Sequence, residues 1–406
     1  MHSPDSPVAT DRPSLDEKNS SWARSDCGVW KTVALSVAGT HFILEFGPGH
    51  EATAHEVELL WGPLLGLSPD PALGAAGSAP EVIRLRFIDP NSKSPGSHPG
   101  DQSSSTFVAA GPHAAYRVSG DMTRALISRL AGQHLLLHAG AVELPGIGTV
   151  LVVGASGAGK STATSLLGRH GRYLTDELTI LHPSTHDLTA YPKPVSRVRK
   201  GGSSKFDLDL GSQGLIAGMH AEAPSQIVLL DREPSGDAYA SRVPLAEALM
   251  ALIPQTSSLW AVPGGLNSLA RAVAGAGGAL RARYSEAEQL EGILQRPPAP
   301  LLEDWDELVP ASPSREVSHA SDLVRVLRDV QSLAIGRTVI ALRQGGAIRL
   351  DGVGSAVWTC LVSSGPLSRR EITERVAMQL GDNSAANRIT QRAVDEMIST
   401  GWLNSQ

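Results

Sequence analysis

Apolar and polar residues alternate with the period of β-strands at 31–39 and 40–47, and the two runs meet at Gly39. This pattern predicts a hairpin near the start of a small mixed α/β region at 29–120, which also contains long stretches rich in Pro, Gly and Ser. Residues 1–28 have no apolar run and are rich in Ser, Pro and Asp, so we expect a disordered tail there.

The spacing of apolar residues becomes helical at 121–132. Residues 135–168 then follow the order strand, turn, buried strand, glycine loop and helix, and further strands are predicted at 172–181 and 226–233. Strands that alternate with helices favour a mainly parallel sheet, so residues 121–295 are predicted to form an α/β domain.

The end of the chain has a pattern of its own. A proline-rich stretch at 296–320 predicts a linker. Residues 338–352 predict a strand pair around Gly345 and Gly346, and three runs with helical spacing follow. A hairpin followed by three helices predicts a small winged-helix-like domain at 321–406.

Composition limits the class of protein. Of the 406 residues, 41% are hydrophobic and 19% are charged, and the formal net charge is −6. The apolar content supports globular domains, whereas the acidic balance argues against a dedicated nucleic-acid-binding protein. Cys27 and Cys360 alone cannot form a disulfide framework or a cysteine zinc site. Since no apolar stretch approaches the ~18–20 residues that span a bilayer and no secretory signal is found, we expect a cytoplasmic protein without a membrane partner.

The strongest chemical signal is the run from Gly154 to Ser161, in which Gly and four residues precede Gly-Lys-Ser. Glycines let backbone N–H groups surround phosphate oxygens, and the helix that follows adds positive dipole. The run predicts a phosphate-binding loop (P-loop), with Lys160 at the β- and γ-phosphates and the Ser161 hydroxyl on Mg²⁺. The alternative is a glycine-rich turn that binds nothing. The predicted nucleotide-binding residues are Gly154, Ala155, Ser156, Gly157, Ala158, Gly159, Lys160, Ser161 and Thr162.

Three more candidate residues lie on either side of this loop in the sequence, at similar separations from it. His138 lies sixteen residues before its first glycine, in the run LLLHAG, and Asp176 lies sixteen residues after Lys160, followed by Glu177 in the run LTDE. This order of histidine, loop and paired acids resembles the kinase domain of bacterial HPr kinase/phosphorylase. It is more similar still to the HPr-kinase-like proteins of peptide natural-product clusters, where a segment like YPKPVS also follows. The resemblance covers residues 120–294.

The resemblance implies an ATP-dependent phosphotransferase that uses Mg²⁺. Asp176 would act on the substrate hydroxyl, Glu177 would help Ser161 hold the metal, and His138 would lie near the transferred phosphate. The family usually has Asp-Asp where this chain has Asp-Glu, and the glycine-containing signature of true HPr kinase/phosphorylases is not found, so sugar-transport regulation is not expected. Taken alone, His138 could be a strand-end histidine satisfied by backbone, and Asp176 could cap a turn.

A group of cations follows the paired acids in the run YPKPVSRVRKGGSSK. Its Gly- and Ser-rich end resembles a mobile lid, and a cation there could stabilise charge on the transferred phosphoryl group. The alternative for each residue is an ordinary solvated charge. The five cations are Lys193, Arg197, Arg199, Lys200 and Lys205.

Residues 323–404 resemble the PqqD-like domains that recognise precursor peptides. The residues that carry the resemblance are Leu350, Asp351, Trp358, Ser368, Glu371, Ile372, Gly401 and Leu403. Trp358, Ile372 and Leu403 are expected in the core, and Ser368 and Glu371 are expected to form a capping box.

In the PqqD-like family a leader peptide adds as a strand to the hairpin and packs on the last helix. A winged helix could instead bind DNA. From residue 320 onward, however, ten Arg and no Lys face five Asp and three Glu, and this excess of positive charge is too weak to favour DNA.

These features together predict an ATP-dependent kinase that phosphorylates a Ser or Thr hydroxyl of a ribosomally synthesised precursor peptide, whose leader the C-terminal domain captures. Two alternatives stay open. One is a kinase for free serine or another small molecule, and the other is a non-catalytic, nucleotide-gated peptide adaptor. The family's kinases often form rings, so a homo-oligomer is a further expectation of the resemblance.

Overall fold

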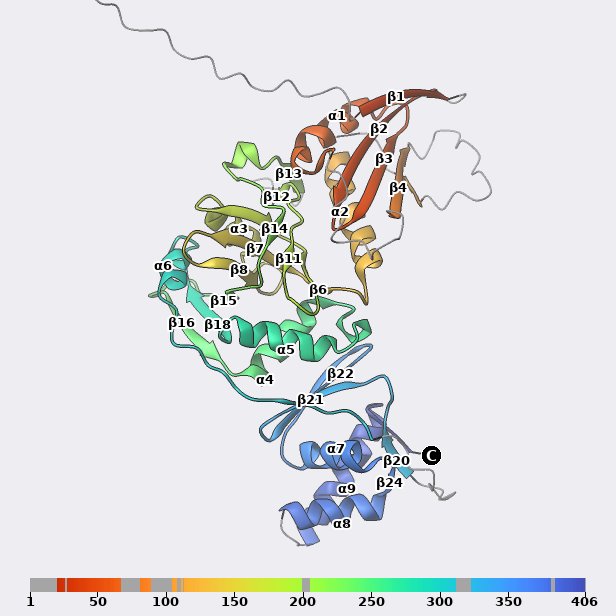
Figure 1. The fold of residues 1–406 in the computed structure, drawn as a ribbon, viewed down its shortest axis with the longest axis vertical. Helices are drawn as coiled ribbons and strands as arrows, with labels where there is room; N and C mark the ends of the chain where they lie inside the picture. The colour runs from red at the N-terminus through yellow and green to blue at the C-terminus, as the bar shows by residue number, and fades with distance from the viewer. Residues whose placement is uncertain are drawn as a thin grey trace, which may run out of the picture. The chain divides into compact units, whose positions relative to one another are not determined.

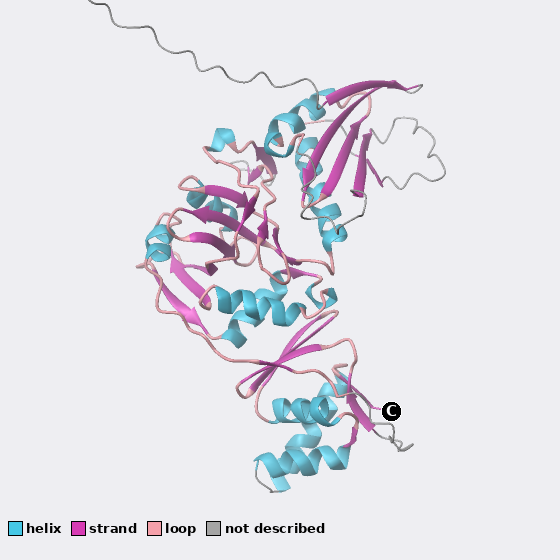
Figure 2. Ribbon diagram, in the orientation of Figure 1, coloured by secondary structure: helices cyan, strands magenta, loops and turns pink. Residues whose placement is uncertain are grey.

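The computed structural model describes residues 20–25, 28–66, 81–88, 104–107, 111, 113–198, 205–311, 323–380 and 384–405. The chain divides into two compact units, residues 1–119 with 204–206 and residues 120–203 with 207–406. Both units combine helices with sheets, which confirms the mixed α/β class (Figures 1 and 2). Among the described residues, no helix is long and apolar enough to cross a membrane.

The first unit is built on a five-stranded sheet in the order β1-β2-β3-β4-β5. Its β2 and β3 pair antiparallel across the turn at Ala38 and Gly39, which confirms the predicted hairpin. Figure 1 shows β2, β3 and β4 side by side. The elements of this unit are β1 (Ser20–Ser25), β2 (Gly28–Val37), β3 (Thr40–Phe46), α1 (Glu51–Leu60), η2 (Gly62–Leu64), β4 (Glu81–Ile88) and β5 (Ser104–Phe107).

Strand β1 corrects the prediction of a disordered tail at 1–28. Its residues pair with β2 from Ser20 opposite Val33 to Ser25 opposite Gly28. Strand pairing uses main-chain N–H and C=O groups, which a polar sequence supplies as well as an apolar one. A prediction based on composition therefore misses this strand. The rest of the predicted tail, residues 1–19 and 26–27, lies outside the described residues.

The second unit holds two larger sheets, one with strand order β16-β18-β15-β8-β7-β9 and one with order β14-β11-β10-β6-β17. In the first, β8, β15 and β18 are parallel, whereas β16, β7 and β9 run antiparallel to their neighbours. Two of the five strand pairs in this sheet are parallel and three are antiparallel, so the prediction of a mainly parallel sheet is wrong. For β7 and β8 the three-residue turn at 145–147 is the physical reason, because only antiparallel neighbours can be joined so tightly.

The second unit alternates strands with helices, and two of the elements named here, α2 and β13, begin in residues of the first unit. The predicted helix at 121–132 begins earlier, at Ala114. The strands are β6 (Leu135–Leu137), β7 (Ala139–Leu144), β8 (Gly148–Val153), β9 (Arg172–Thr175), β10 (Thr179–Leu181), β11 (Leu188–Thr189), β12 (Val195–Val198), β13 (Lys205–Leu208), β14 (His220–Ala221), β15 (Gln226–Arg232), β16 (Tyr239–Val243), β17 (Thr256–Ser257) and β18 (Ala279–Tyr284). The helices are α2 (Ala114–Leu130), α3 (Lys160–Gly168), η3 (Gly211–Gln213), α4 (Leu245–Leu252), η4 (Ile253–Gln255), η5 (Leu259–Ala261), α5 (Gly265–Gly275) and α6 (Gln289–Gln295).

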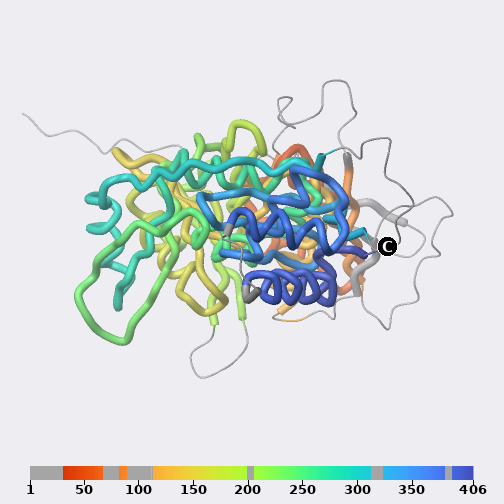
Figure 3. Tube along the Cα trace, turned by 90° about the horizontal axis from the view of Figure 1, so that it is seen from below, coloured from red at the N-terminus to blue at the C-terminus, as the bar shows by residue number. Residues whose placement is uncertain are grey.

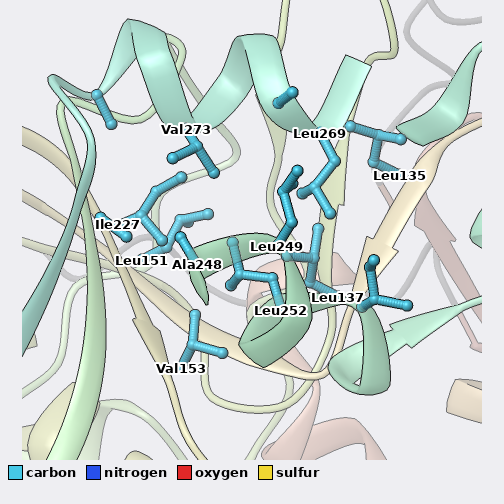
Figure 4. Close-up of a cluster of buried hydrophobic side chains, with 14 of the residues drawn as sticks. Leu135, Leu137, Leu151, Val153, Ile227, Ala248, Leu249, Leu252, Leu269 and Val273 are labelled. Atoms are coloured by element: carbon cyan, nitrogen blue, oxygen red, sulfur yellow. The ribbon is translucent and has the colours of Figure 1, made fainter. Parts of the chain in front are cut away.

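The main core of the second unit lies between the sheets and helices α4 and α5. Figure 4 shows Leu249 and Leu252 of α4 and Leu269 of α5 pointing toward strand residues such as Leu137 and Leu151. All five side chains are buried. This packing fixes the strands that lead to the candidate site.

The C-terminal part of the chain has the predicted hairpin and three helices. Strands β22 and β23 pair antiparallel across Gln344 and Gly345, and β21 and β19 complete a sheet in the order β19-β21-β22-β23. The elements are β19 (Asp306–Glu307), β20 (Leu323–Val326), β21 (Gln331–Ile335), β22 (Thr338–Arg343), β23 (Gly346–Leu350), α7 (Val353–Ser364), β24 (Leu367–Ser368), α8 (Arg369–Leu380), α9 (Ser384–Ser399) and β25 (Leu403–Ser405).

Two local predictions for this part are confirmed. Trp358, Ile372 and Leu403 are buried in one hydrophobic cluster. The Ser368 N–H donates to a carboxylate oxygen of Glu371 at 2.8 Å, and the Glu371 N–H donates to the Ser368 hydroxyl at 3.3 Å, which is the reciprocal pattern of a capping box.

Residues 296–311, here called the strap, are the described part of the predicted linker, and Figure 3 traces their path. The N–H of Leu301 donates to the Gly277 carbonyl at 3.1 Å, and the indole N–H of Trp305 donates to Asn267 at 2.9 Å. Further along, the strap contributes β19 to the C-terminal sheet. The strap is therefore bound both to α5 and the residues that follow it and to the C-terminal sheet.

Apolar side chains of the C-terminal sheet also belong to the main core. Leu333 and Ile335 of β21 and Ile340 and Leu342 of β22 lie in the same hydrophobic cluster as α4 and α5. The residues at 323–405 thus share a core with the rest of the second unit.

Candidate functional site

The glycine loop, residues 154–159, follows β8 and leads directly into α3, as the sequence predicts. Gly157 and Gly159 have φ of 84° and 92°, a left-handed backbone that other residues rarely adopt. A Cβ on Gly154 would lie 2.9 Å from the Cβ of Ala158. The three glycines of the loop are therefore required by its shape, and residues 155–157 are exposed to solvent.

Lys160 is the first residue of α3, and its side chain lies over the glycine loop. Its ammonium donates to the carbonyls of Gly154 at 2.7 Å and Ala155 at 3.2 Å, and the residue is only 7% exposed. Burial lowers the pKa of Lys160, while the charges of Asp176 and Glu177 act to raise it. The amine is thus held in place by the same loop whose glycines shape the turn.

Tyr284, at the end of β18, contacts the glycine loop at its end nearest to α3. Its hydroxyl donates to the Ala158 carbonyl at 3.1 Å and would lie 3.2 Å from a Cβ on Gly159. The sequence offers no signal for this contact, because the two residues are far apart along the chain.

Helix α3 packs on β7 at a point of very close approach. A Cβ on Gly140 would lie 2.1 Å from the hydroxyl oxygen of Thr164. That hydroxyl donates to the Lys160 carbonyl at 2.8 Å. Gly140 of the LLLHAG run therefore sets the distance between the helix that begins with Lys160 and the strand that follows His138.

His138 and the paired acids lie where the chain crosses from one sheet to the other. The sequence predicts single strands through LLLHAG and LTDELTIL, but each is two strands in two sheets. Before and after the crossings, Leu137 pairs with Thr179 in one sheet and Ala141 pairs with Thr175 in the other. The crossings place His138 beside the segment at 176–178, although 38 residues separate His138 from Asp176.

Asp176 is buried and its carboxylate is held on one side. The residue is 4% exposed, and its Oδ1 accepts a hydrogen bond from the Tyr173 hydroxyl at 3.0 Å. Burial raises the pKa of the Tyr173 hydroxyl well above its ordinary value, and the negative charge of Asp176 adds to this, so Tyr173 stays a donor. The side chain of Glu177 is more open, at 38% exposed.

The imidazole of His138 lies within electrostatic reach of Lys160 and of the paired acids. Its backbone N–H donates to the Gln255 carbonyl at 2.6 Å. Burial and then the charge of Lys160 lower the pKa of its imidazole, against the opposing effect of Glu177 and Asp176. The imidazole is therefore neutral at neutral pH and can accept or donate a hydrogen bond beside Lys160.

The structure contradicts the lid hypothesis for Lys193. Its side chain is buried among the paired acids, with the ammonium 3.4 Å from Asp176 Oδ1 and 3.2 Å from Glu177 Oε2. The lid prediction fails because YPKP turns the lysine inward, toward carboxylates that precede it in the chain. Of the other predicted lid cations, Lys205 is exposed and Arg197 is half-buried, while Arg199 and Lys200 lie outside the described residues.

The remaining predicted residues lie at the start of α3. Thr162 is exposed and Ser161 is half-buried in the first turn of the helix. Across the described ranges, no three His, Cys, Asp or Glu side chains gather in a way that could hold a metal ion. The predicted metal ligands, the Ser161 hydroxyl and the Glu177 carboxylate, are thus not part of such a cluster.

The described site thus brings together His138, Lys160, Asp176, Glu177 and Lys193 from segments spread over 56 residues. Comparison of the chain with protein-family models finds no match, and neither does comparison with curated proteins.

Proposed function

We propose that the chain is an ATP-dependent kinase that transfers a phosphoryl group to a Ser or Thr hydroxyl. The observation that carries the proposal is that the glycine loop with Lys160 and the carboxylate of Asp176, which are separate in the sequence, belong to one site. Lys160, at the start of the helix that follows the glycine loop, donates to a carbonyl of that loop, and the negative charge of the buried Asp176 acts to raise the pKa of Lys160. An anion-binding loop beside a carboxylate is the arrangement that phosphoryl transfer requires.

The residues fit a nucleotide with Mg²⁺. The N–H groups of the exposed residues 155–157 and the ammonium of Lys160 are donors for phosphate oxygens, and the Ser161 hydroxyl and Glu177 carboxylate are the kind of oxygen ligand that Mg²⁺ prefers. The metal would supply positive charge at the β- and γ-phosphates. This fit does not depend on the exact family to which the chain belongs.

In this mechanism the substrate hydroxyl donates its proton to Asp176 as its oxygen attacks the γ-phosphorus of ATP. The bond between that phosphorus and the bridging oxygen breaks, and the electron pair leaves with ADP. Lys160 stabilises the negative charge that grows on the phosphate oxygens, and neutral His138 orients the reacting groups by hydrogen bonding. Catalysis consists mainly of positioning and charge stabilisation.

We further propose that the acceptor belongs to a ribosomally synthesised peptide whose leader adds as a strand to β23. This strand ends its sheet, whereas β19 of the strap covers the opposite end. Next to the first residues of β23 lies a cavity of about 390 Å³, lined by Met250, Trp260, Leu342 and Gly346 among others. A strand edge beside a partly apolar cavity suits a bound extended peptide, with main-chain pairing for affinity and the cavity for one side chain. The similarity to PqqD-like domains supports the same assignment.

The test of kinase activity uses the full chain with ATP labelled in the γ-phosphate. Two acceptors are compared, free L-serine and a library of Ser- and Thr-containing peptides. We expect the label in peptides, and we expect Lys160→Ala to abolish transfer while the far-UV circular dichroism spectrum stays unchanged. Arg271→Ala, at an exposed cation of α5, is the control and should transfer label normally. Undiminished transfer by Lys160→Ala would refute the role of the loop.

The same assay separates the two acceptor classes. Label in free serine, at a rate that peptides do not change, would favour a small-molecule kinase. ATP binding and peptide binding without any transfer would favour the nucleotide-gated adaptor.

A further inference from the structure

Lys193 is held between two prolines on a segment tied to the strand that leads to Asp176. Its main-chain carbonyl accepts from the Tyr173 hydroxyl at 3.3 Å, and the N–H of Tyr191 donates to the Leu174 carbonyl at 3.0 Å. Pro192 and Pro194 restrict the backbone on both sides of the lysine. These hydrogen bonds and prolines thus fix the position of the Lys193 ammonium relative to the Asp176 carboxylate.

The ammonium of Lys193 is surrounded by oxygen. Besides Asp176 and Glu177, it donates to the Pro194 carbonyl and to the Ser196 hydroxyl, each at 3.2 Å, and the residue is 2% exposed. The Ser196 hydroxyl in turn donates to Asp207 at 2.7 Å. A buried ammonium without acids around it would cost several kcal/mol, so these carboxylates are what keep it there.

The contacts on Asp176 are one-sided. Tyr173 and Lys193 both engage Oδ1, and neither contact involves Oδ2. A carboxylate held in this way presents its second oxygen in a fixed direction. The groups that fix it contribute nothing to the glycine loop.

We infer that Lys193 is a positioning residue for phosphoryl transfer: it holds Oδ1 of Asp176, together with Tyr173, so that Oδ2 meets the substrate hydroxyl, and it balances the charge of two adjacent acids. The inference rests on the proposed kinase function. It assigns no contact between Lys193 and the phosphates, which distinguishes it from a lid cation.

The test removes the Lys193 amine by mutation and then supplies a small amine in solution to replace it. In the full chain, Lys193→Ala should lower kcat by about 10²-fold, because a displaced base loses the aligned geometry, while KM for ATP changes by no more than about threefold. Added n-propylammonium should restore at least about a tenth of the lost rate by entering the space of the missing side chain. The neutral n-propanol has nearly the same size and should restore none.

Controls separate this inference from the proposed function. Arg271→Ala, at an exposed cation of α5, should keep the wild-type kcat and show no response to the amine. If Lys193→Ala does not fold, Lys193→Met with Asp207→Asn, which removes one cation and one anion together, replaces it with the same expected loss of kcat.

Wild-type kcat in a folded Lys193 variant, with Lys160→Ala inactive, would overturn the inference and leave the kinase proposal standing. Equal rescue by n-propanol would also overturn it, because the side chain would then only fill space. A wild-type chain that transfers no phosphate would overturn both.

Discussion

Gly140→Ala should push α3 away from β7 and thereby move Lys160. The added Cβ would lie 2.1 Å from the Thr164 hydroxyl oxygen and 3.2 Å from the Thr164 Cβ. The first distance is far below van der Waals contact, whereas the second requires a shift of only a few tenths of an ångström. The clash therefore comes almost entirely from one oxygen atom.

This geometry gives the expected size of the effect. Forcing an extra methyl group into a packed interior costs about 1–3 kcal/mol of unfolding free energy. Thr164→Ala alone removes the hydrogen bond to the Lys160 carbonyl and costs about 0.5–1.5 kcal/mol. In the double variant the oxygen is gone, so Gly140→Ala should add no more than about 0.5 kcal/mol to the cost of Thr164→Ala.

Urea unfolding followed by far-UV circular dichroism measures the four free energies of this double-mutant cycle. If the cost of Gly140→Ala in unfolding free energy is smaller by about 1 kcal/mol or more when Thr164→Ala is also present, the close contact between α3 and β7 is supported. Additive losses would refute the reasoning, because they would show that the Gly140 methyl group clashes with something other than the Thr164 oxygen. A fully stable Gly140→Ala would refute it as well.

Three further predictions concern the site and the C-terminal core. Asp176→Asn keeps the size of the side chain but removes the proton acceptor, so phosphoryl transfer should fall about 10²–10⁴-fold with ATP affinity within about threefold of wild type; the reverse pattern would make Asp176 a metal ligand. Trp358→Ala removes a fully buried indole whose N–H donates to Ser332 at 3.1 Å, and the unfolding free energy should drop by about 3–5 kcal/mol; an unchanged midpoint in urea would contradict this packing. Because the folded-state pKa of His138 lies below 6.5, the unfolded chain binds this proton first as pH falls below 6.5, so the stability of wild type relative to His138→Gln should decrease between pH 7 and pH 5; an increase would show that the folded state favours the charged imidazole.

Local features of this chain were predictable from sequence. The hairpin at Gly39, the loop from Gly154 to Gly159 and the capping box of Ser368 and Glu371 are each defined by neighbouring residues. Their backbone conformations follow from glycine at left-handed positions and from side chains that satisfy nearby N–H groups.

Features that depend on distant pairing were not predictable. The divisions of LLLHAG and LTDELTIL between two sheets follow from long-range strand register, for which a single sequence gives no signal. Lys193 has the sequence context of a solvated charge, because the acids that bury it precede it by sixteen and seventeen residues. The strap was missed because prolines indicate the absence of regular structure but not the absence of tertiary contacts.

The common core of α4, α5 and the C-terminal sheet bears on how such proteins can be recombined. Grafting residues 323–405 onto another protein by cutting at the strap would uncover Leu333, Ile335, Ile340 and Leu342, and it would leave the matching faces of α4 and α5 exposed to water. A chimera that keeps this interior must carry α4 and α5 along, so its crossover belongs upstream of Leu245. In this chain, therefore, residues 323–405 are not an autonomous cassette, and their sheet has to change together with the helices that pack against it.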